Sequence, residues 1–189
     1  MQRSSAVLWG LVLAAGTVSP AFAQLSPQSN APIDVSSDQL EVQAKTCVAI
    51  YRGSVEALQG TSRLRSNTLT VYSAQRASAS GAGGPTGNCG SPTKLEADGA
   101  VYYTTPQQVV KGDHAVYLAD AKTITVTGDV VISQGKNVVV GNRLVINTDT
   151  GQATMESNAK GRGQQGRVRM VFYPNSDSGG IFPSSSPKR

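Results

Sequence analysis

The sequence predicts an all-β protein, a twisted and open-ended β-jelly roll or β-solenoid-like sandwich made of repeated bent hairpins. β-branched residues dominate residues 33–174, and no stretch of a dozen residues there keeps the 3.6-residue apolar period of a helix. A pattern of glycine, apolar and Asn or Asp residues also recurs three times without gaps. Such a repeat outranks the other fold signals, because it indicates one structural unit stacked several times.

The N-terminal segment is typical of an export signal. Arg3 supplies a positive charge, residues 6–18 are mostly apolar, and Ala21-Phe22-Ala23 offers small residues at the two positions that signal peptidase reads. The apolar run is shorter than the roughly 20 residues of a transmembrane helix. We therefore expect cleavage after Ala23 and a periplasmic protein, with an uncleaved anchor as the alternative. Residues 24–32 have the composition of a linker.

The repeat begins at Gly53, Gly99 and Gly128, and the period-two apolar phase continues on both sides of each glycine. A glycine inside a strand marks a bend or a close backbone approach. Further on, the phase breaks at a small residue followed by Asn67, Asp113 or Asn142, where we expect a bulge that turns the strand. The second half of the repeat, which contains the Asn or Asp and the apolar residues around it, also fits residues 35–42. The apolar pairs that precede the glycines are Ala49 and Tyr51, Leu95 and Ala97, and Ile124 and Val126.

Three segments fall outside the repeat. Residues 78–92 are rich in Ser, Ala, Gly and Pro and predict a flexible insert, and residues 175–189 predict a disordered tail. The last strand is expected over residues 167–173 and the first over residues 33–42, and neither contains the proline or inward charge that blocks an edge.

Composition narrows the chemistry. The chain has 189 residues, which suits one domain, and Lys and Arg outnumber Asp and Glu by 17 to 12. With 1 His and 2 Cys, it offers one base for a nucleophilic triad and too few ligands for a zinc cluster. No Gly-x-Ser-x-Gly motif accompanies His114. We expect no enzyme, no metal and no cofactor, although a two-carboxylate site at Asp34 and Asp38 stays open and unsupported.

Together these features resemble the periplasmic lipopolysaccharide-transport bridge proteins of the organic-solvent-tolerance protein A type, the LptA-like family. The resemblance covers roughly residues 32–174, as a periodic pattern and not as one motif. The insert and the two cysteines depart from the simplest family pattern. The segments that carry the resemblance are residues 33–42, 51–55, 139–146 and 171–174.

The resemblance implies a groove for the acyl chains of lipopolysaccharide between the apolar faces. Apolar alternation alone favours a dry sandwich core, whereas the inward glycines and many small residues predict a thin core that could open. Tyr51 and Tyr103 share the inner phase. The predicted groove residues are Val35, Leu40, Val42, Ile50, Val55, Leu64, Leu69, Val71, Val101, Val110, Tyr117, Val130, Ile132, Val139, Leu144, Ile146 and Phe172.

The resemblance also implies partners: lipopolysaccharide through its lipid A, an inner-membrane-anchored relative, an outer-membrane translocon, and further copies stacked head to tail. The open edges predict the same stacking, because strand addition supplies main-chain hydrogen bonds. We place the assembly edges at Ile33, Val35, Val168, Met170 and Phe172. The alternative function is a structural or adhesive exported β-repeat protein with a dry core.

Two further residue groups carry expectations. Cys47 and Cys89 form an even pair in an oxidising compartment, which favours a disulfide. The cations at 160, 162, 167 and 169 favour a solvated face, with anionic lipid phosphates or an acidic partner as the alternative. The Arg/Gly spacing of that segment also occurs in RNA-binding proteins, but export argues against nucleic acid.

Overall fold

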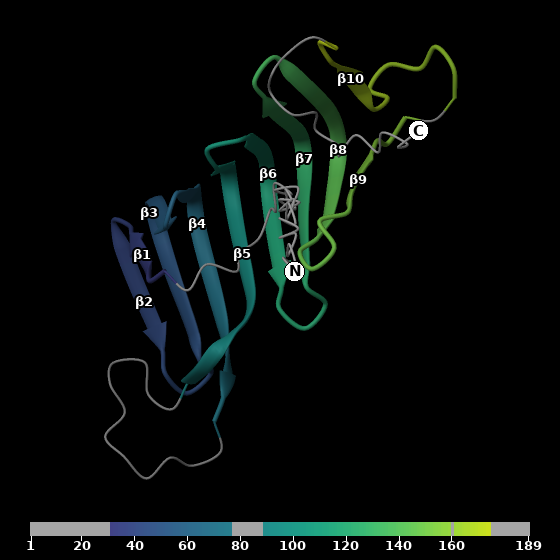
Figure 1. Ribbon diagram of the computed structural model, residues 1–189. Coiled ribbons are helices and arrows are strands. Elements are labelled where there is room, and N and C mark those ends of the chain that lie inside the picture. The colour runs from purple at the N-terminus through teal and green to yellow at the C-terminus, as the bar shows by residue number, and fades with distance from the viewer. Residues whose placement is uncertain (1–30, 77–88, 160, 175–189) are drawn as a thin grey trace, which may run out of the picture.

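The structure is a computed structural model that describes residues 31–76, 89–159 and 161–174 (Figure 1). Ten strands form one antiparallel sheet in the order β1-β3-β4-β5-β6-β7-β8-β10, with β2 also paired to β3 and β9 to β8. This confirms the predicted all-β, open-ended architecture. The strands are β1 (Ile33–Ser36), β2 (Gln39–Gln43), β3 (Val48–Gln59), β4 (Ser62–Gln75), β5 (Cys89–Thr104), β6 (Val109–Leu118), β7 (Thr123–Gln134), β8 (Asn137–Asn147), β9 (Ala153–Glu156) and β10 (Arg169–Val171).

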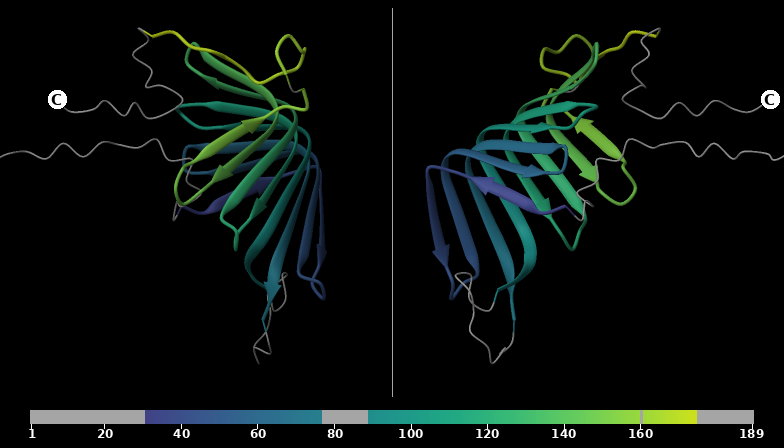
Figure 2. Two further views of the ribbon diagram at one scale, coloured as in Figure 1. Left: turned by 90° about the vertical axis from the view of Figure 1, so that its right-hand side faces the viewer. Right: turned by 60° about the vertical axis from the view of Figure 1, so that its left-hand side comes forward.

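The two facing layers expected from the sequence are two arms of this single sheet. Each long strand runs through both arms and bends at a corner between them, and the sheet twists strongly along its length (Figure 2). We call the arm in line with β1 and β10 the β1 arm and the arm in line with β2 and β9 the β2 arm. The β1 arm comprises residues 33–36, 55–66, 101–112, 130–141 and 169–171, and the β2 arm comprises residues 39–52, 68–76, 89–98, 114–127 and 143–156.

The corners are made by contacts between an Asn or Asp side chain and a glycine on the next strand. Gly128 has φ +103°, and a Cβ at this position would overlap the carboxylate of Asp113 on β6. Oδ2 of Asp113 also accepts a hydrogen bond from the backbone N–H of Asp129 at 3.2 Å. The same contact recurs between Asp38 and Gly53 and between Asn67 and Gly99. Only glycine combines this backbone conformation with room for the neighbouring side chain.

The predicted bulge position is wrong. The extra residue of each bulge lies on the strand that carries the repeat glycine, and not on the paired strand that carries the Asn or Asp. Between β3 and β4, for example, Arg52 to Val55 stands opposite Thr68 to Ser66. The physical reason is that the bulge needs a positive φ, which glycine adopts without steric cost, while the Asn or Asp then caps the bulge from the side.

Both edges of the sheet differ from the expected strands. The first strand breaks at Ser37 and Asp38 into β1 and β2, because Asp38 occupies the corner and its N–H donates to the carbonyl of Gly53 at 3.0 Å. The last strand is only β10, so Val168 and Phe172 lie outside it. Residues 89–92, which the sequence assigns to the insert, begin β5. The expected signal segment, the tail and the rest of the insert lie outside the described residues.

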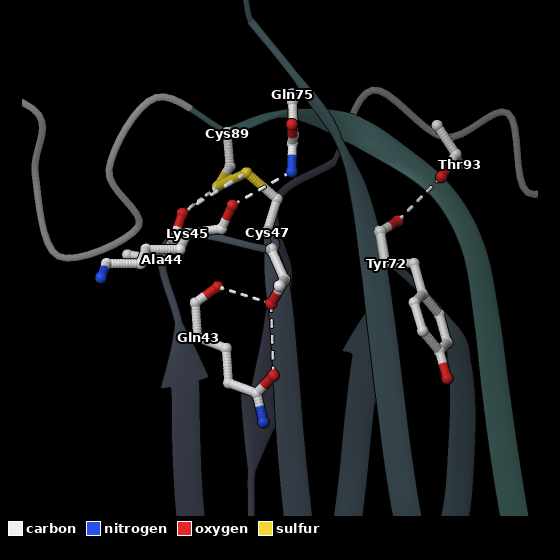
Figure 3. The surroundings of a disulfide bond; sticks show 9 residues. Gln43, Ala44, Lys45, Cys47, Tyr72, Gln75, Cys89 and Thr93 are labelled. Carbon is white, nitrogen blue, oxygen red and sulfur yellow. Dashed lines mark hydrogen bonds between the residues drawn. A yellow bond between two sulfur atoms is a disulfide. The ribbon is translucent and has the colours of Figure 1, made fainter.

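A disulfide joins the β2–β3 turn to the start of β5 (Figure 3). The Cα atoms of Cys47 and Cys89 are 5.4 Å apart, although the two residues are 42 positions apart in sequence. Around the bond, the Cys47 carbonyl accepts the N–H of Ser73 at 2.9 Å, and Nε2 of Gln75 donates to the Lys45 carbonyl at 3.0 Å. The turn and the two ends of the insert are therefore tied together across β4.

Two clusters of buried side chains form the core. One lies on β6 to β8 and the other on β3 to β5. Val130 and Leu144 are fully buried in the first cluster, and Val55 and Val101 in the second. The two clusters together cover the inner face of the six long strands from β3 to β8.

We expect Gly128→Ala to lower the free energy of unfolding by about 2 kcal/mol or more, from backbone strain at positive φ together with the clash on Asp113. Gly151→Ala is the matched control: its φ is +70°, but nothing lies within 4 Å of the added Cβ. Urea unfolding of both variants measures the difference. Equal losses in the two variants would show that the Asp113 contact contributes nothing.

Removal of the disulfide should lower the unfolding free energy by up to about 4 kcal/mol, because the bond restricts a long loop in the unfolded chain. The measurement is urea unfolding of the mature protein with and without a reductant. The Cys47→Ser/Cys89→Ser variant is the control and should be insensitive to the reductant. A wild-type transition that does not move on reduction, or two free thiols in the denatured non-reduced protein, would contradict the bond.

Candidate functional site: an apolar cavity between the two arms

An apolar cavity of about 350 Å³ lies on the inner face of the bent sheet, the face that carries the two buried clusters. Both arms contribute to its wall, so it exists only because the corners turn the arms toward each other. Its lining includes no Asp, Glu, Lys, Arg or His among the described residues. The lining includes Ile33, Ala57, Leu64, Val101, Tyr103 and Val110 of the β1 arm, and Leu69, Leu95, Ala97, Ala115, Tyr117, Ile124, Val126 and Ile146 of the β2 arm.

The predicted groove residues lie in a cavity wall and in a packed core, and the two share Leu69, Val101, Val110 and Ile146. Leu64, Leu69, Val101, Val110, Tyr117 and Ile146 line the cavity. Val55, Val130, Ile132, Val139 and Leu144 are buried in the two clusters, and Val35 and Val71 pack against the second cluster. The inner face therefore has both a packed core and a cavity, and some residues of the core also form the cavity wall.

Ile50 does not belong to the inner face. It pairs with Thr70 on β4 and Glu41 on β2, whereas its neighbour Tyr51 packs against the inner cluster. Because successive side chains of a strand point to opposite faces, Ile50 lies on the outer face. The prediction that Ile50 lines the groove is wrong, because strand alternation places its side chain on the outer face.

Three other predicted groove residues lie away from the cavity. Leu40 and Val42 pair with inner residues of β3, but β2 is an edge strand and these side chains are 55% and 40% exposed. Phe172 follows the end of β10 and is 62% exposed. Exposed apolar side chains at a sheet edge are available to a further strand, so these residues fit the edges better than the groove.

Several cavity residues are absent from the predicted groove set, among them Leu95, Ala97, Ile124 and Val126. The sequence contained a signal for them, because they continue the period-two phase immediately before Gly99 and Gly128. Like Tyr51, they occupy the alternate positions that precede a repeat glycine and therefore face inward. The period-two alternation before each glycine thus predicts these four residues as well.

The outer face carries several ion pairs. Arg52 with Glu41 and Arg143 with Glu156 form ion pairs at 2.9 Å each. The Glu96 carboxylate accepts hydrogen bonds from Lys94 at 2.8 Å and from the Tyr72 hydroxyl at 2.9 Å. The Lys94 hydrogen bond is the main cause that lowers the pKa of the Glu96 carboxyl. These exposed pairs contribute little to stability.

The other candidate residues do not form a catalytic or metal centre. His114 Nδ1 contacts Asp98 Oδ1 on the outer face, and Asp38 is occupied at a corner, away from Asp34 on β1. In the described ranges no three His, Cys, Asp or Glu side chains gather as metal ligands would. Arg162, Arg167 and Arg169 are exposed, and position 160 lies outside the described residues. The part of the chain that is described forms no helix long and apolar enough to span a membrane.

Comparison with known proteins agrees with this arrangement. Residues 34–152 match the family described as LptA/(LptD N-terminal domain) LPS transport protein. The chain belongs to this family. An uncharacterized protein of Rhizobium meliloti (strain 1021) is 30% identical over 153 residues, which cover 80% of this chain and 76% of that protein. The resemblance drawn from the sequence is therefore confirmed.

A solved structure shows the same fold. It is the crystal structure of LptH, the LptA-homologous periplasmic component of the lipopolysaccharide transport device of Pseudomonas aeruginosa. The TM-score is 0.59 at 21% identity, and the match covers 76% of this chain and 96% of LptH. The predicted jelly roll is confirmed by this likeness.

Proposed function

We propose that the protein carries lipopolysaccharide across the periplasm and shelters its acyl chains in the cavity between the β1 and β2 arms. The observation that carries this proposal is the apolar, uncharged cavity, lined in part by both packed clusters, in a member of an LPS transport family. Burial of one methylene contributes about 0.8 kcal/mol, so such a wall favours acyl chains over polar ligands. Membership of the family supplies the substrate class.

Export supports the proposed compartment. The sequence of residues 1–23 predicts a signal that is cleaved after Ala23, and LptH is described as a periplasmic component. A carrier for lipopolysaccharide must work between the inner and outer membranes, where this signal would deliver the chain. Its proposed partners are an inner-membrane-anchored relative and an outer-membrane translocon.

The two edges of the sheet support a bridge built of several molecules. β1 and β2 expose one edge, and β9 and β10 expose the other. A strand of another molecule added there would continue the antiparallel order and extend the inner apolar face from one copy to the next. Met170 fits this role, since it pairs with the buried inner residue Val139 while its own side chain is 40% exposed.

A structural β-repeat protein with a dry core is the second candidate, and the two buried clusters favour it. Ile124 and Thr125 separate the candidates, because they are adjacent on β7 and face opposite sides of the sheet. We expect a photo-crosslinking amino acid at position 124 to label lipopolysaccharide in the periplasm, and the same amino acid at 125 to label none. The readout is a glycolipid-specific stain of the purified protein.

Labelling at position 125 but not at 124 would reject the inner cavity as the lipid site. Absence of labelling at both positions, in a variant with native circular dichroism, would favour the structural candidate.

Met170→Asp should weaken head-to-tail association at least about tenfold and leave the fold intact, because it places a charge at an interface between apolar edges. Leu118→Asp is the matched control: Leu118 is 41% exposed, but at the end of β6, away from both edges. Light scattering over a concentration series measures association. An unchanged oligomer distribution in Met170→Asp, or an equal loss in both variants, would contradict the edge contact.

A further inference from the structure

A second cavity, of about 760 Å³, lies over the outer face of the β1 arm on β3, β4 and β5. Glu56, Arg65 and Tyr102 stand opposite one another across these three strands and line this cavity. Their chain neighbours Ala57, Leu64 and Tyr103 line the apolar cavity on the other face. The same stretch of sheet therefore has an apolar cavity on one side and a polar cavity on the other.

Two arginines in the polar cavity share one carboxylate oxygen. Oε1 of Glu56 lies 3.3 Å from Nε of Arg63 and 2.8 Å from Nε of Arg65. The two arginines are two positions apart on β4, so their side chains leave the same face. In the described part of the chain, no hydrogen bond or ion pair occupies their terminal Nη atoms. Both guanidinium groups are thus held at Nε and keep their outer donors available.

The charge of this cluster is unbalanced. Arg52 and Arg143, elsewhere on the outer face, each have a carboxylate of their own, whereas Arg63 and Arg65 share Glu56. The hydrogen bond from Arg65, with the positive charges of both arginines, lowers the pKa of the Glu56 carboxyl, so the carboxylate stays ionised at neutral pH. One positive charge remains, on two planar groups that match the oxygens of a phosphate.

The remaining lining fits a sugar. Ser36, Ser54, Ser62 and Thr104 also line this cavity, and Tyr102, which pairs with Arg65, is 39% exposed. Hydroxyls and an exposed aromatic face offer the hydrogen bonds and the apolar contact that a saccharide ring uses. A hollow lined in this way suits a phosphorylated saccharide better than the flat acidic surface of a protein.

The two cavities meet at the β3–β4 turn, where Leu58 and Ser62 line both of them. We propose that Arg63 and Arg65 bind a phosphate group on the saccharide head of an amphiphile whose chains occupy the apolar cavity across this rim. The proposal rests on the proposed function for the position of the chains. The arginine site itself depends only on the geometry of the outer face.

The test compares four ligands: dodecyl phosphate and dodecyl maltoside, each below its critical micelle concentration, and glucose 1-phosphate and inorganic phosphate. We expect Arg63→Gln/Arg65→Gln to weaken dodecyl phosphate binding at least about tenfold, as loss of charge-assisted hydrogen bonds predicts. Dodecyl maltoside binding should not change. Arg52→Gln/Arg143→Gln removes the same charge and should stay within about twofold of the wild type. Calorimetry gives the affinities, and circular dichroism confirms the fold.

Unchanged dodecyl phosphate binding in Arg63→Gln/Arg65→Gln, or an equal loss in the Arg52→Gln/Arg143→Gln control, overturns the arginine site. Inorganic phosphate that binds as tightly as glucose 1-phosphate would overturn the saccharide part and leave a free-phosphate site. Failure of dodecyl maltoside to bind the wild type would contradict the apolar carrier function alone. In that case, shifts of the Arg63 and Arg65 Nε–H resonances with glucose 1-phosphate would still support the arginine site.

Discussion

The contact between an Asn or Asp side chain and the glycine of the next strand determines the shape of this protein. It occurs at Asp38 and Gly53, at Asn67 and Gly99, and at Asp113 and Gly128, and so bends successive strands at the same level of the sheet. A sheet bent at one level has two arms whose apolar sides face each other. The inner cavity, the packed clusters and the two open edges all follow from this alignment of corners.

The bend also separates two kinds of chemistry across the thickness of one sheet. Strand alternation places apolar side chains on the inner face and charged side chains on the outer face. The β3–β4 turn is a place where the two faces border a common rim, at Leu58 and Ser62. An amphiphile has the same division into apolar and polar parts, which explains why a bent and open sheet suits a lipid carrier better than a closed sandwich does.

Much of this arrangement could be predicted from the sequence, because the corners have a residue signature. The glycine period gave the bent strands, and the cysteine count gave the Cys47–Cys89 pairing that the structure contains. The bulge was misplaced and Ile50 was assigned to the wrong face, because both depend on register, which pattern alone does not determine. The Arg63–Glu56–Arg65 cluster was missed for the same reason, since Glu56 meets the arginines only through the β3–β4 pairing.

The division of the apolar residues into core and cavity depends on the distance between the arms, a quantity that alternation does not encode. Lipid in the space between the arms would be detected by native mass spectrometry of the protein purified from its own periplasm. We expect a mass increase that matches bound glycolipid and disappears when the protein is unfolded. Protein of unmodified mass from cells that make lipopolysaccharide would contradict this expectation.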